Sequence, residues 1–206
     1  MGYYTRILTP SKAWIPFAEL QSSLKSARLS VTLDIEKGDA DRWLRFIVTS
    51  QQGDSILGIE RNEVSISKDN LGASEIQEFL EEIANAKPDS AVLWLQKYLP
   101  TVQTIYSFEH WDGMNTTTGQ QVFEVLQTEI WSRLGGIFQA DNEGFTNEEG
   151  YHILWQFNEH ASGIWNMAVQ TQDRRWTRFA MNLGDTAQRA AFKEGKVPEG
   201  CQMIAT

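Results

Sequence analysis

Apolar and polar residues alternate along three runs near the C-terminal end of the chain, and each run contains one tryptophan. The runs cover 150–157, 163–171 and 174–183, and their tryptophans are Trp155, Trp165 and Trp176. Alternation with a period of two is typical of a half-buried strand. We therefore predict a three-stranded antiparallel meander, with one face on the core and the other available as a candidate recognition surface.

The two faces of this meander can be assigned from the alternation. Trp155 and Trp165 each fall in the apolar set of their run, and a five-residue turn at 158–162 joins the two runs, so we expect these rings to meet in the core. In the third run Trp176 instead shares its face with Arg174 and Arg178.

The register of the last two strands depends on the length of the turn between them. A two-residue turn at Gln172-Asp173 would place Met167 opposite Arg178, whereas a three-residue turn places Met167 opposite Phe179. Burying an unpaired guanidinium costs several kcal/mol, on the order of other buried polar groups without partners. We therefore predict the second register, which also places Trp165 opposite Met181.

In this register Trp176 lies on the polar face, between Arg174 and Arg178. A ring bracketed by guanidinium groups can bind an aromatic ring, a carboxylate or a phosphate of a partner. Two alternatives stay open: a helix covers this face, or the arginines pair with the acidic loop at 141–149.

The N-terminal part of the chain predicts four strands and one helix. Alternating runs at 2–8, 28–36, 43–50 and 55–62 are typical of strands, and Gly and Asp in the links between the last three favour turns. Pro16 precedes an apolar helical stripe, so a short helix is expected after the first strand. The predicted order is β-α-β-β-β.

Three helices are predicted in the middle of the chain. Ser74 and Thr118 each have Gln three positions later, which is the spacing of a capping box. Pro88 opens a further helix, which Pro100 stops. A strand at 102–109 precedes the helix that begins near Thr118, and a Gly-Gly pair ends that helix.

The grouping of strands and helices, without strict alternation, favours an α+β fold. We predict mainly antiparallel sheet regions at both ends of the chain, bridged by the central helices, and a closing helix near 185–193. A single domain over 1–206 is expected, with possible lobes at 1–70 and 71–206. The sequence leaves open whether the N- and C-terminal strands form one sheet.

Composition and charge restrict the possible partners. Hydrophobic residues make up 41% and charged residues 22% of the 206 residues, as in ordinary globular proteins, but eight tryptophans imply an unusual aromatic contribution to a core or an interface. The net charge is −9, and residues 104–206 carry 7 basic and 13 acidic side chains. Such a field repels nucleic acid and anionic membranes and favours a basic protein partner.

Cysteine usage and hydropathy predict the compartment. The single Cys201 excludes an intramolecular disulfide, which fits a reducing environment. The first residues lack the apolar core of a signal peptide, and no run approaches the length of a membrane span. We expect a cytoplasmic soluble protein of unknown oligomeric state.

The segment 139–152 is acidic and contains no basic residue. Its carboxylates are Asp141, Glu143, Glu148 and Glu149. The glycine that an EF-hand needs stands at the wrong offset, so no metal or cofactor is expected, although Asp141 and Glu143 could bind a hard cation weakly. The acidity suits docking to a basic partner, and the alternative is a solvated loop.

One local constellation could serve acid–base chemistry. Glu109, His110 and Asp112 lie within four residues at the end of a predicted strand. The alternative is that they make turn and cap hydrogen bonds. The histidines lack metal-binding spacing, and no phosphate-loop, dinucleotide or nucleophile-elbow motif occurs.

These observations favour a non-catalytic binding protein, of the immunity or inhibitor type, that docks a basic protein partner through its acidic and aromatic C-terminal surface. The expected binding residues are Trp176, Arg174, Arg178, Asp141, Glu143, Glu148 and Glu149. The alternatives are a small hydrolase that uses Glu109, His110 and Asp112 or the 141–149 carboxylates, and a sugar binder that stacks glycans on Trp176 or Trp111.

Overall fold

Antiparallel strands and five α-helices make up the computed structural model, which describes residues 2–65, 70–171 and 173–205. This confirms the predicted α+β class. The chain divides into two compact units, each built from two segments. The first unit comprises Met1–Ala73 and Val102–Gly136, and the second comprises Ser74–Thr101 and Ile137–Thr206.

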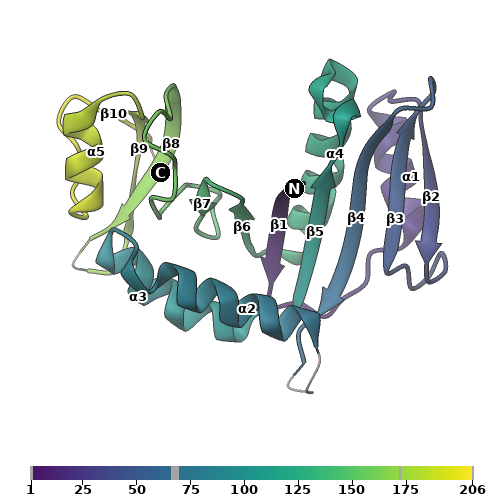
Figure 1. Cartoon of the computed structure of the whole chain (residues 1–206), viewed down its shortest axis with the longest axis horizontal. Helices are drawn as coiled ribbons and strands as arrows, with labels where there is room; N and C mark the ends of the chain where they lie inside the picture. Colours follow the sequence, from purple (N-terminus) through teal and green to yellow (C-terminus); the bar gives the residue numbers. More distant parts are fainter. Residues whose placement is uncertain (1, 66–69, 172, 206) are drawn as a thin grey trace. The chain divides into compact units, whose positions relative to one another are not determined.

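Five strands of the first unit lie side by side in the order β2-β3-β4-β5-β1, and all neighbours are antiparallel (Figure 1). Their bounds are β1 Tyr3–Thr9, β2 Val31–Lys37, β3 Arg45–Ser50, β4 Ser55–Glu63 and β5 Thr104–His110. The predicted β-α-β-β-β order is therefore confirmed. β5 lies between β4 and β1 although it comes last in sequence. Its residues Ile105, Tyr106 and Phe108 are fully buried, as expected of a central strand.

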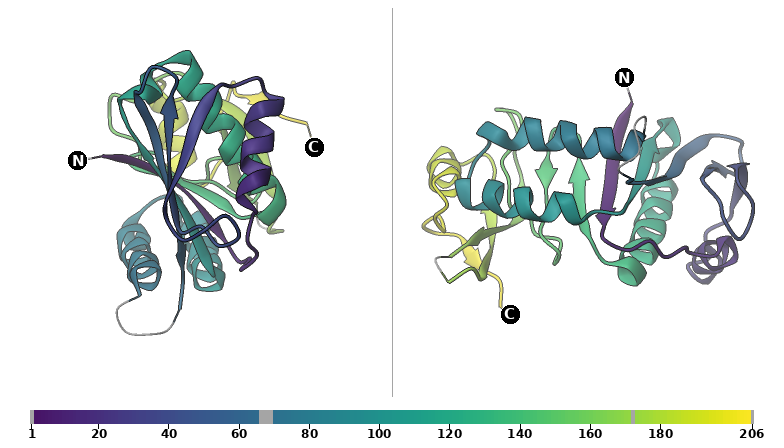
Figure 2. Two further views of the ribbon diagram at one scale, coloured as in Figure 1. Left: turned by 90° about the vertical axis from the view of Figure 1, so that its right-hand side faces the viewer. Right: turned by 90° about the horizontal axis from the view of Figure 1, so that it is seen from below.

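Two helices pack on one face of these strands. They are α1 (Phe17–Ser26) and α4 (Thr117–Leu134), and a short 3-10 helix η3 (Asp112–Asn115) leads into the second (Figure 2). Phe17 of α1 meets Phe46 of β3, and Phe123 of α4 meets Phe108 of β5, both edge to face. These aromatic contacts fix the helices on the sheet.

Both predicted capping boxes are misplaced by a few residues. α4 begins at Thr117 because Thr116, in extended conformation, accepts the Gly119 N–H at 3.0 Å. Thr118 therefore lies inside the helix. Likewise α2 (Leu71–Glu82) begins after Asn70, whose side chain accepts the Ala73 N–H. Asn is as good an N-cap as Ser, and the earlier cap determines where the helix starts.

Helices α2 and α3 (Asp89–Tyr98) run antiparallel side by side (Figure 2), joined through the 3-10 helix η1 (Ile83–Asn85). The 3-10 helix η2 (Leu99–Thr101) follows α3. Apolar periodicity in these helices predicts two core-facing stripes. Ile76, Phe79 and Ile83 of the first are buried and Leu80 is half-buried, and Val92, Leu95, Tyr98 and Leu99 of the second are buried. Phe79 contacts Phe145 of the short hairpin β6 (Ile137–Ala140) and β7 (Gly144–Phe145) edge to face.

A three-stranded antiparallel sheet in the order β10-β9-β8 completes the second unit, with α5 (Thr186–Lys193) beside it. The strands are β8 Ile164–Gln170, β9 Trp176–Asn182 and β10 Gln202–Met203. Their core consists of Phe157, Met167, Val169, Phe179, Met181, Leu183 and Phe192, with Trp155 and Trp165 packed against it.

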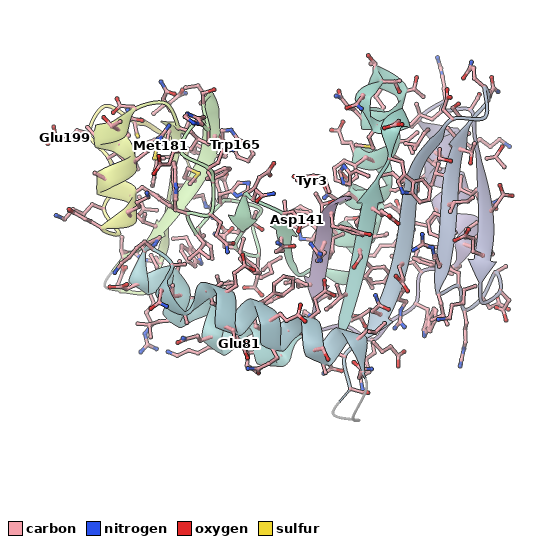
Figure 3. All side chains as sticks on the ribbon, in the orientation of Figure 1. Tyr3, Glu81, Asp141, Trp165, Met181 and Glu199 are labelled. Atoms are coloured by element: carbon pink, nitrogen blue, oxygen red, sulfur yellow. The ribbon has the colours of Figure 1, made fainter. Side chains whose placement is uncertain are left out.

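The predicted register of β8 and β9 is confirmed. Trp165 pairs with Met181 and Met167 pairs with Phe179, and Figure 3 shows Trp165 and Met181 close together on this sheet. Gln172, which belonged to the rejected two-residue turn, lies outside the described residues. Apolar residues therefore face apolar residues across the two strands, as the burial argument requires.

The first predicted strand of the meander is wrong. The run around Trp155 makes isolated bridges only: Trp155 with Lys87, and His152 with Thr146 and, in parallel, with Met167. The parallel bridge cannot come from a tight hairpin, so this run does not fold back onto β8. The third strand of the sheet is β10 instead. Trp155 and Trp165 are linked through Phe157, whose ring lies 5.2 and 4.8 Å from theirs.

Among the helices that the structure describes, none combines the length and the apolar character needed to cross a membrane.

Candidate binding groove

A groove of about 710 Å³ lies in the second unit, along the start of β9 and the turn before it. Its lining comprises Glu149, Thr171, Asp173, Arg174, Arg175, Trp176, Thr177, Arg178, Met203 and Ile204. Four of the residues predicted for the binding surface are in this set: Trp176, Arg174, Arg178 and Glu149. Three guanidinium groups and two carboxylates make the groove locally cationic in a chain of net charge −9. We call this site the arginine groove.

The turn between β8 and β9 presents Arg174. The Thr171 hydroxyl lies within hydrogen-bond distance of both the Arg175 carbonyl and the Asp173 carboxylate, and the Arg174 N–H donates to the Thr171 carbonyl at 2.9 Å. These bonds hold Arg174 at φ +63°, in the left-handed region. A non-glycine residue in that region is uncommon and requires support from its neighbours. The turn therefore fixes the direction in which the exposed Arg174 leaves the backbone.

Asp173 is occupied by its neighbours in the turn. The hydrogen bond from Thr171 and the pairing with Arg175 lower the pKa of Asp173 below its ordinary value. Arg175 is highly exposed, with 84% of its side chain accessible. The pair with Asp173 partly neutralises the charge of Arg175, whereas none of the described residues forms an ion pair with Arg174. Arg174 is therefore the cation of the arginine groove most available to a ligand.

Arg178 is held between the acidic loop and an aromatic ring. Its guanidinium donates to Glu149 at 2.7 Å and lies 5.4 Å from the centre of the Tyr151 ring. Only 20% of its side chain is exposed, and its Nε is buried without a hydrogen-bond partner. This pairing is one of the two alternatives that the sequence left open. It places a carboxylate of the chain itself on a cation of the groove.

Trp176 is partly covered by α3, which is the other alternative. Its ring meets Trp94 edge to face at 5.5 Å, and Trp94 stacks on Tyr98 at 5.0 Å. Trp176 nevertheless keeps part of its surface in the groove, beside Met203 and Ile204. The contact with Trp94 supports the ring from one side, so a ligand would meet a preorganised aromatic surface.

The other loop carboxylates do not line the arginine groove. Asp141 and Glu143 lie in the turn after β6, where the Glu143 N–H donates to the Ala140 carbonyl. Glu148 is exposed and is close enough to Tyr98 to contribute, after burial, to raising the pKa of that phenol. Within the ranges that the structure describes, no three His, Cys, Asp or Glu side chains gather as metal ligands would. Of the predicted acidic surface, only Glu149 therefore reaches the groove.

Glu109 and His110 lie on opposite faces of β5. Partial burial disfavours the Glu109 carboxylate, but hydrogen bonds from Arg45, Trp111 and Tyr4 prevail and lower its pKa. His110 Nε2 lies 3.0 Å from the Thr5 hydroxyl, and its ring contacts Tyr3 and Phe123. Neighbouring residues of a strand point to opposite faces, so these two groups do not act on one substrate atom.

Asp112, the third member of that constellation, begins η3 and is exposed. The trio of Glu109, His110 and Asp112 thus shares no site in the structure. The indole of Trp111, an alternative sugar-stacking residue, instead covers Gly58 on β4, where a Cβ would approach it within 3.0 Å. The Trp111 ring therefore packs against the sheet.

His152 lies beside β8, in the segment that carries Glu149 and Tyr151. Burial lowers its pKa to about 4, and its ring packs against Trp165 at 4.8 Å and Phe157 at 5.5 Å. Its Nδ1 is buried without a partner. The half-buried imidazole packs on aromatic rings, and the backbone bonds of His152 to Asn166 and Ala168 attach the segment to β8.

Several residues of the groove were missed by the sequence interpretation. Arg175 was present in the same run, but its side chain alternates to the other face of an ideal strand, and only the turn brings it into the groove. Met203 and Ile204 come from β10 and the residue after it, a strand too short for a pattern of alternation to reveal. Trp94, which supports the Trp176 ring from outside the groove, was missed because the sequence does not show what its helix packs against.

Comparison of the chain with protein-family models, with curated proteins and with solved structures found no match.

Proposed function

We propose that the protein is a non-catalytic binding protein and that the arginine groove is its recognition site. The observation that carries this proposal is the juxtaposition of Arg174, Arg178 and Trp176 in one groove, where Trp94 supports the Trp176 ring. Aromatic and arginine side chains dominate the energetics of protein interfaces. An aromatic ring that is already held in place by a neighbour loses less entropy on binding.

The local charge of the groove favours an anionic group of the partner. A guanidinium forms a bidentate pair with a carboxylate, and such charge-assisted hydrogen bonds are about twice as strong as neutral ones. Arg174 can accept this role without losing an ion pair to another described residue. The partner's remaining contacts would fall on Trp176, Met203 and Ile204, which supply apolar surface beside the cations.

Site-specific photocrosslinking tests the location of the site. A benzoylphenylalanine at Arg175, which lines the groove, is expected to give a discrete covalent adduct in cells that express the protein. The same residue at Thr128, on the exposed side of α4, serves as the matched control and is expected to give none. The proposal fails if position 175 gives no adduct or if both positions give the same adducts.

A basic protein partner is the second candidate, and the net charge of −9 favours it. Long-range attraction would steer such a partner, and the exposed Glu148 would contribute to its docking. Under this hypothesis, replacing Glu148 with Gln weakens association and Arg174→Gln strengthens it. The groove proposal requires the opposite for Arg174, so the pair of variants separates the two candidates.

A further inference from the structure

A carboxylate of the chain itself already binds one of the arginines of the groove. Glu149 comes from the acidic loop, and its carboxylate accepts a hydrogen bond from Arg178 at 2.7 Å. Two residues later, Tyr151 places its ring against the same guanidinium, 5.4 Å away. A peptide-borne carboxylate with an aromatic neighbour therefore fits one of the cations of the groove.

Arg178 has binding capacity that Glu149 does not use. The pair with Glu149 runs through one terminal nitrogen, and the Nε–H is buried without an acceptor. Because the Nε is buried, a carboxylate from a ligand would pair with the terminal nitrogens of Arg178, as Glu149 does. Because 43% of the Glu149 side chain is exposed, it can leave Arg178 at a modest cost.

Arg174 supplies the second cation, and no described residue forms an ion pair with it. Arg174 lies in the turn before β9, Trp176 begins β9, Arg178 follows on the same face of that strand, and all three line the groove. The groove thus offers cation, aromatic ring and cation in sequence. An extended segment presents alternate side chains to one surface, so acidic and apolar side chains two residues apart match this order.

The groove also lies beside β10, whose Met203 and the following Ile204 line it. β10 pairs with Ala180 and Phe179, and the Ile204 N–H donates to the Arg178 carbonyl at 3.0 Å. By alternation, the backbone N–H and carbonyl of Trp176 point to the same edge of β9.

We propose that the arginine groove binds an extended acidic peptide segment, whose Asp or Glu carboxylates pair with Arg174 and Arg178 while an intervening apolar side chain packs on Trp176. Glu149 is then an internal competitor that the ligand displaces from Arg178. This inference rests on the proposed function of the groove and adds the chemical class of the partner and the role of Glu149.

The test uses synthetic peptides and the whole chain. The probe is the fluorescein-labelled, amidated peptide Gly-Ser-Glu-Ser-Leu-Ser-Glu-Gly, in which Glu, Leu and Glu share one face when the peptide is extended, and its counterpart carries Gln in place of both Glu residues. Fluorescence anisotropy is expected to show binding of the Glu peptide that is at least about tenfold tighter than that of the Gln peptide. Arg174→Gln should weaken binding of the Glu peptide by about tenfold.

The competitor role of Glu149 has its own matched pair of variants. Glu149→Gln should strengthen binding of the Glu peptide severalfold, because Arg178 becomes available. Glu148→Gln removes the same charge one residue away, outside the groove lining, and should change binding by less than about twofold because exposed charges are screened. Equal effects of the two variants, or equal binding of the two peptides, overturn the inference.

Failure of this inference can be told from failure of the proposed function. If benzoylphenylalanine at position 175 captures a partner but Arg174→Gln leaves the capture unchanged, the groove is a binding site and the acidic peptide is wrong. If position 175 captures nothing and the Glu peptide does not bind, both proposals fail.

Discussion

At the scale of single residues, the most deeply buried charge belongs to Arg61 on β4. Its side chain is 0% exposed and stacks 3.8 Å from the centre of the Trp14 ring. It donates to the Lys12 carbonyl at 3.1 Å and to Glu63 at 2.9 Å. Arg61 thus ties the segment before α1 to the sheet through a fork of hydrogen bonds that Lys could not reproduce.

Replacing Arg61 with Met is expected to lower the free energy of unfolding by about 3 kcal/mol, because buried acceptors lose their donor. Arg45→Met is the matched control. Arg45 pairs with Glu36 and Glu109, but 30% of its side chain is exposed, so its loss should cost less than about 1 kcal/mol. Urea denaturation followed by circular dichroism measures both. Similar losses in the two variants would contradict the difference in burial.

His152 predicts a pH dependence of stability. Burial between Trp165 and Phe157 lowers its pKa to about 4, from 6.5 in the unfolded chain. Between these values the unfolded state binds more protons, so stability is full above pH 6.5 and falls as the pH drops towards 4. This group can account for a loss of about 3 kcal/mol at most.

The variant His152→Phe keeps the ring and removes the titration, so its unfolding free energy should fall less between pH 6.5 and 4 than that of the wild type. His160→Phe, at an exposed position, should leave the pH profile of the wild type unchanged. Urea unfolding curves of the three proteins between pH 4 and 6.5 measure this pH dependence. A profile that His152→Phe does not flatten would assign the acid sensitivity to other groups.

At the scale of elements, the start of α4 depends on one side chain. Thr116→Ala removes the acceptor of the Gly119 N–H and should destabilise the first unit by about 1 kcal/mol. Thr118→Ala, two residues further on, lies inside the helix and should be neutral or slightly stabilising, since Ala is the better helix former. Thermal unfolding of the two variants compares the observed cap with the one that the capping-box spacing predicted.

Alternation predicts elements well where only one side of a strand is buried. In β9, Phe179 and Met181 face the core while Trp176 faces the groove. The register could be deduced from the cost of placing Arg178 opposite the buried Met167. The run around Trp155 failed for the opposite reason. Ile153 and Leu154 are adjacent and both fully buried, so this segment is enclosed on two sides and alternation carries no information about it.

The candidate site was predictable only in part, for the same physical reason. Residues within one strand, such as Trp176 and Arg178, share a face by local geometry, so the sequence could place them together. The contacts of Trp94 with Trp176 and of Glu149 with Arg178 join segments tens of residues apart. The sequence suggested a covering helix and an ion pair with the acidic loop as alternatives. It could not identify Trp94 and Glu149 as the partners, because these contacts depend on tertiary packing.

At the scale of the whole molecule, the two compact units do not follow the order of the chain. The first unit needs β5 and α4, which come after α2 and α3 in sequence. The predicted lobe over 1–70 lacks both, and in that fragment β1 would have no neighbour on the sheet because β5 is its partner. The lobe boundaries stay a prediction that fragments can address.

A fragment of residues 1–73 is expected to remain unfolded, with poorly dispersed amide signals in its NMR spectrum. Joining residue 65 to residue 102 with a short Gly-Ser linker should restore dispersion in a chain that ends at 136, since the Val64 N–H already donates to the Gln103 carbonyl at 2.9 Å. A well-dispersed spectrum of 1–73 alone would contradict the requirement for β5.

The position of β5 between β4 and β1 also has a consequence during synthesis. β4 leaves the ribosome complete at Glu63, but its neighbour is not finished until His110. At about 5–20 residues per second, β4 waits about 2–10 s with one edge unpaired. An unpaired edge carrying Leu57 and Ile59 is a template for association with other nascent chains. The speed of translation through α2 and α3 should therefore influence how much of the protein escapes aggregation.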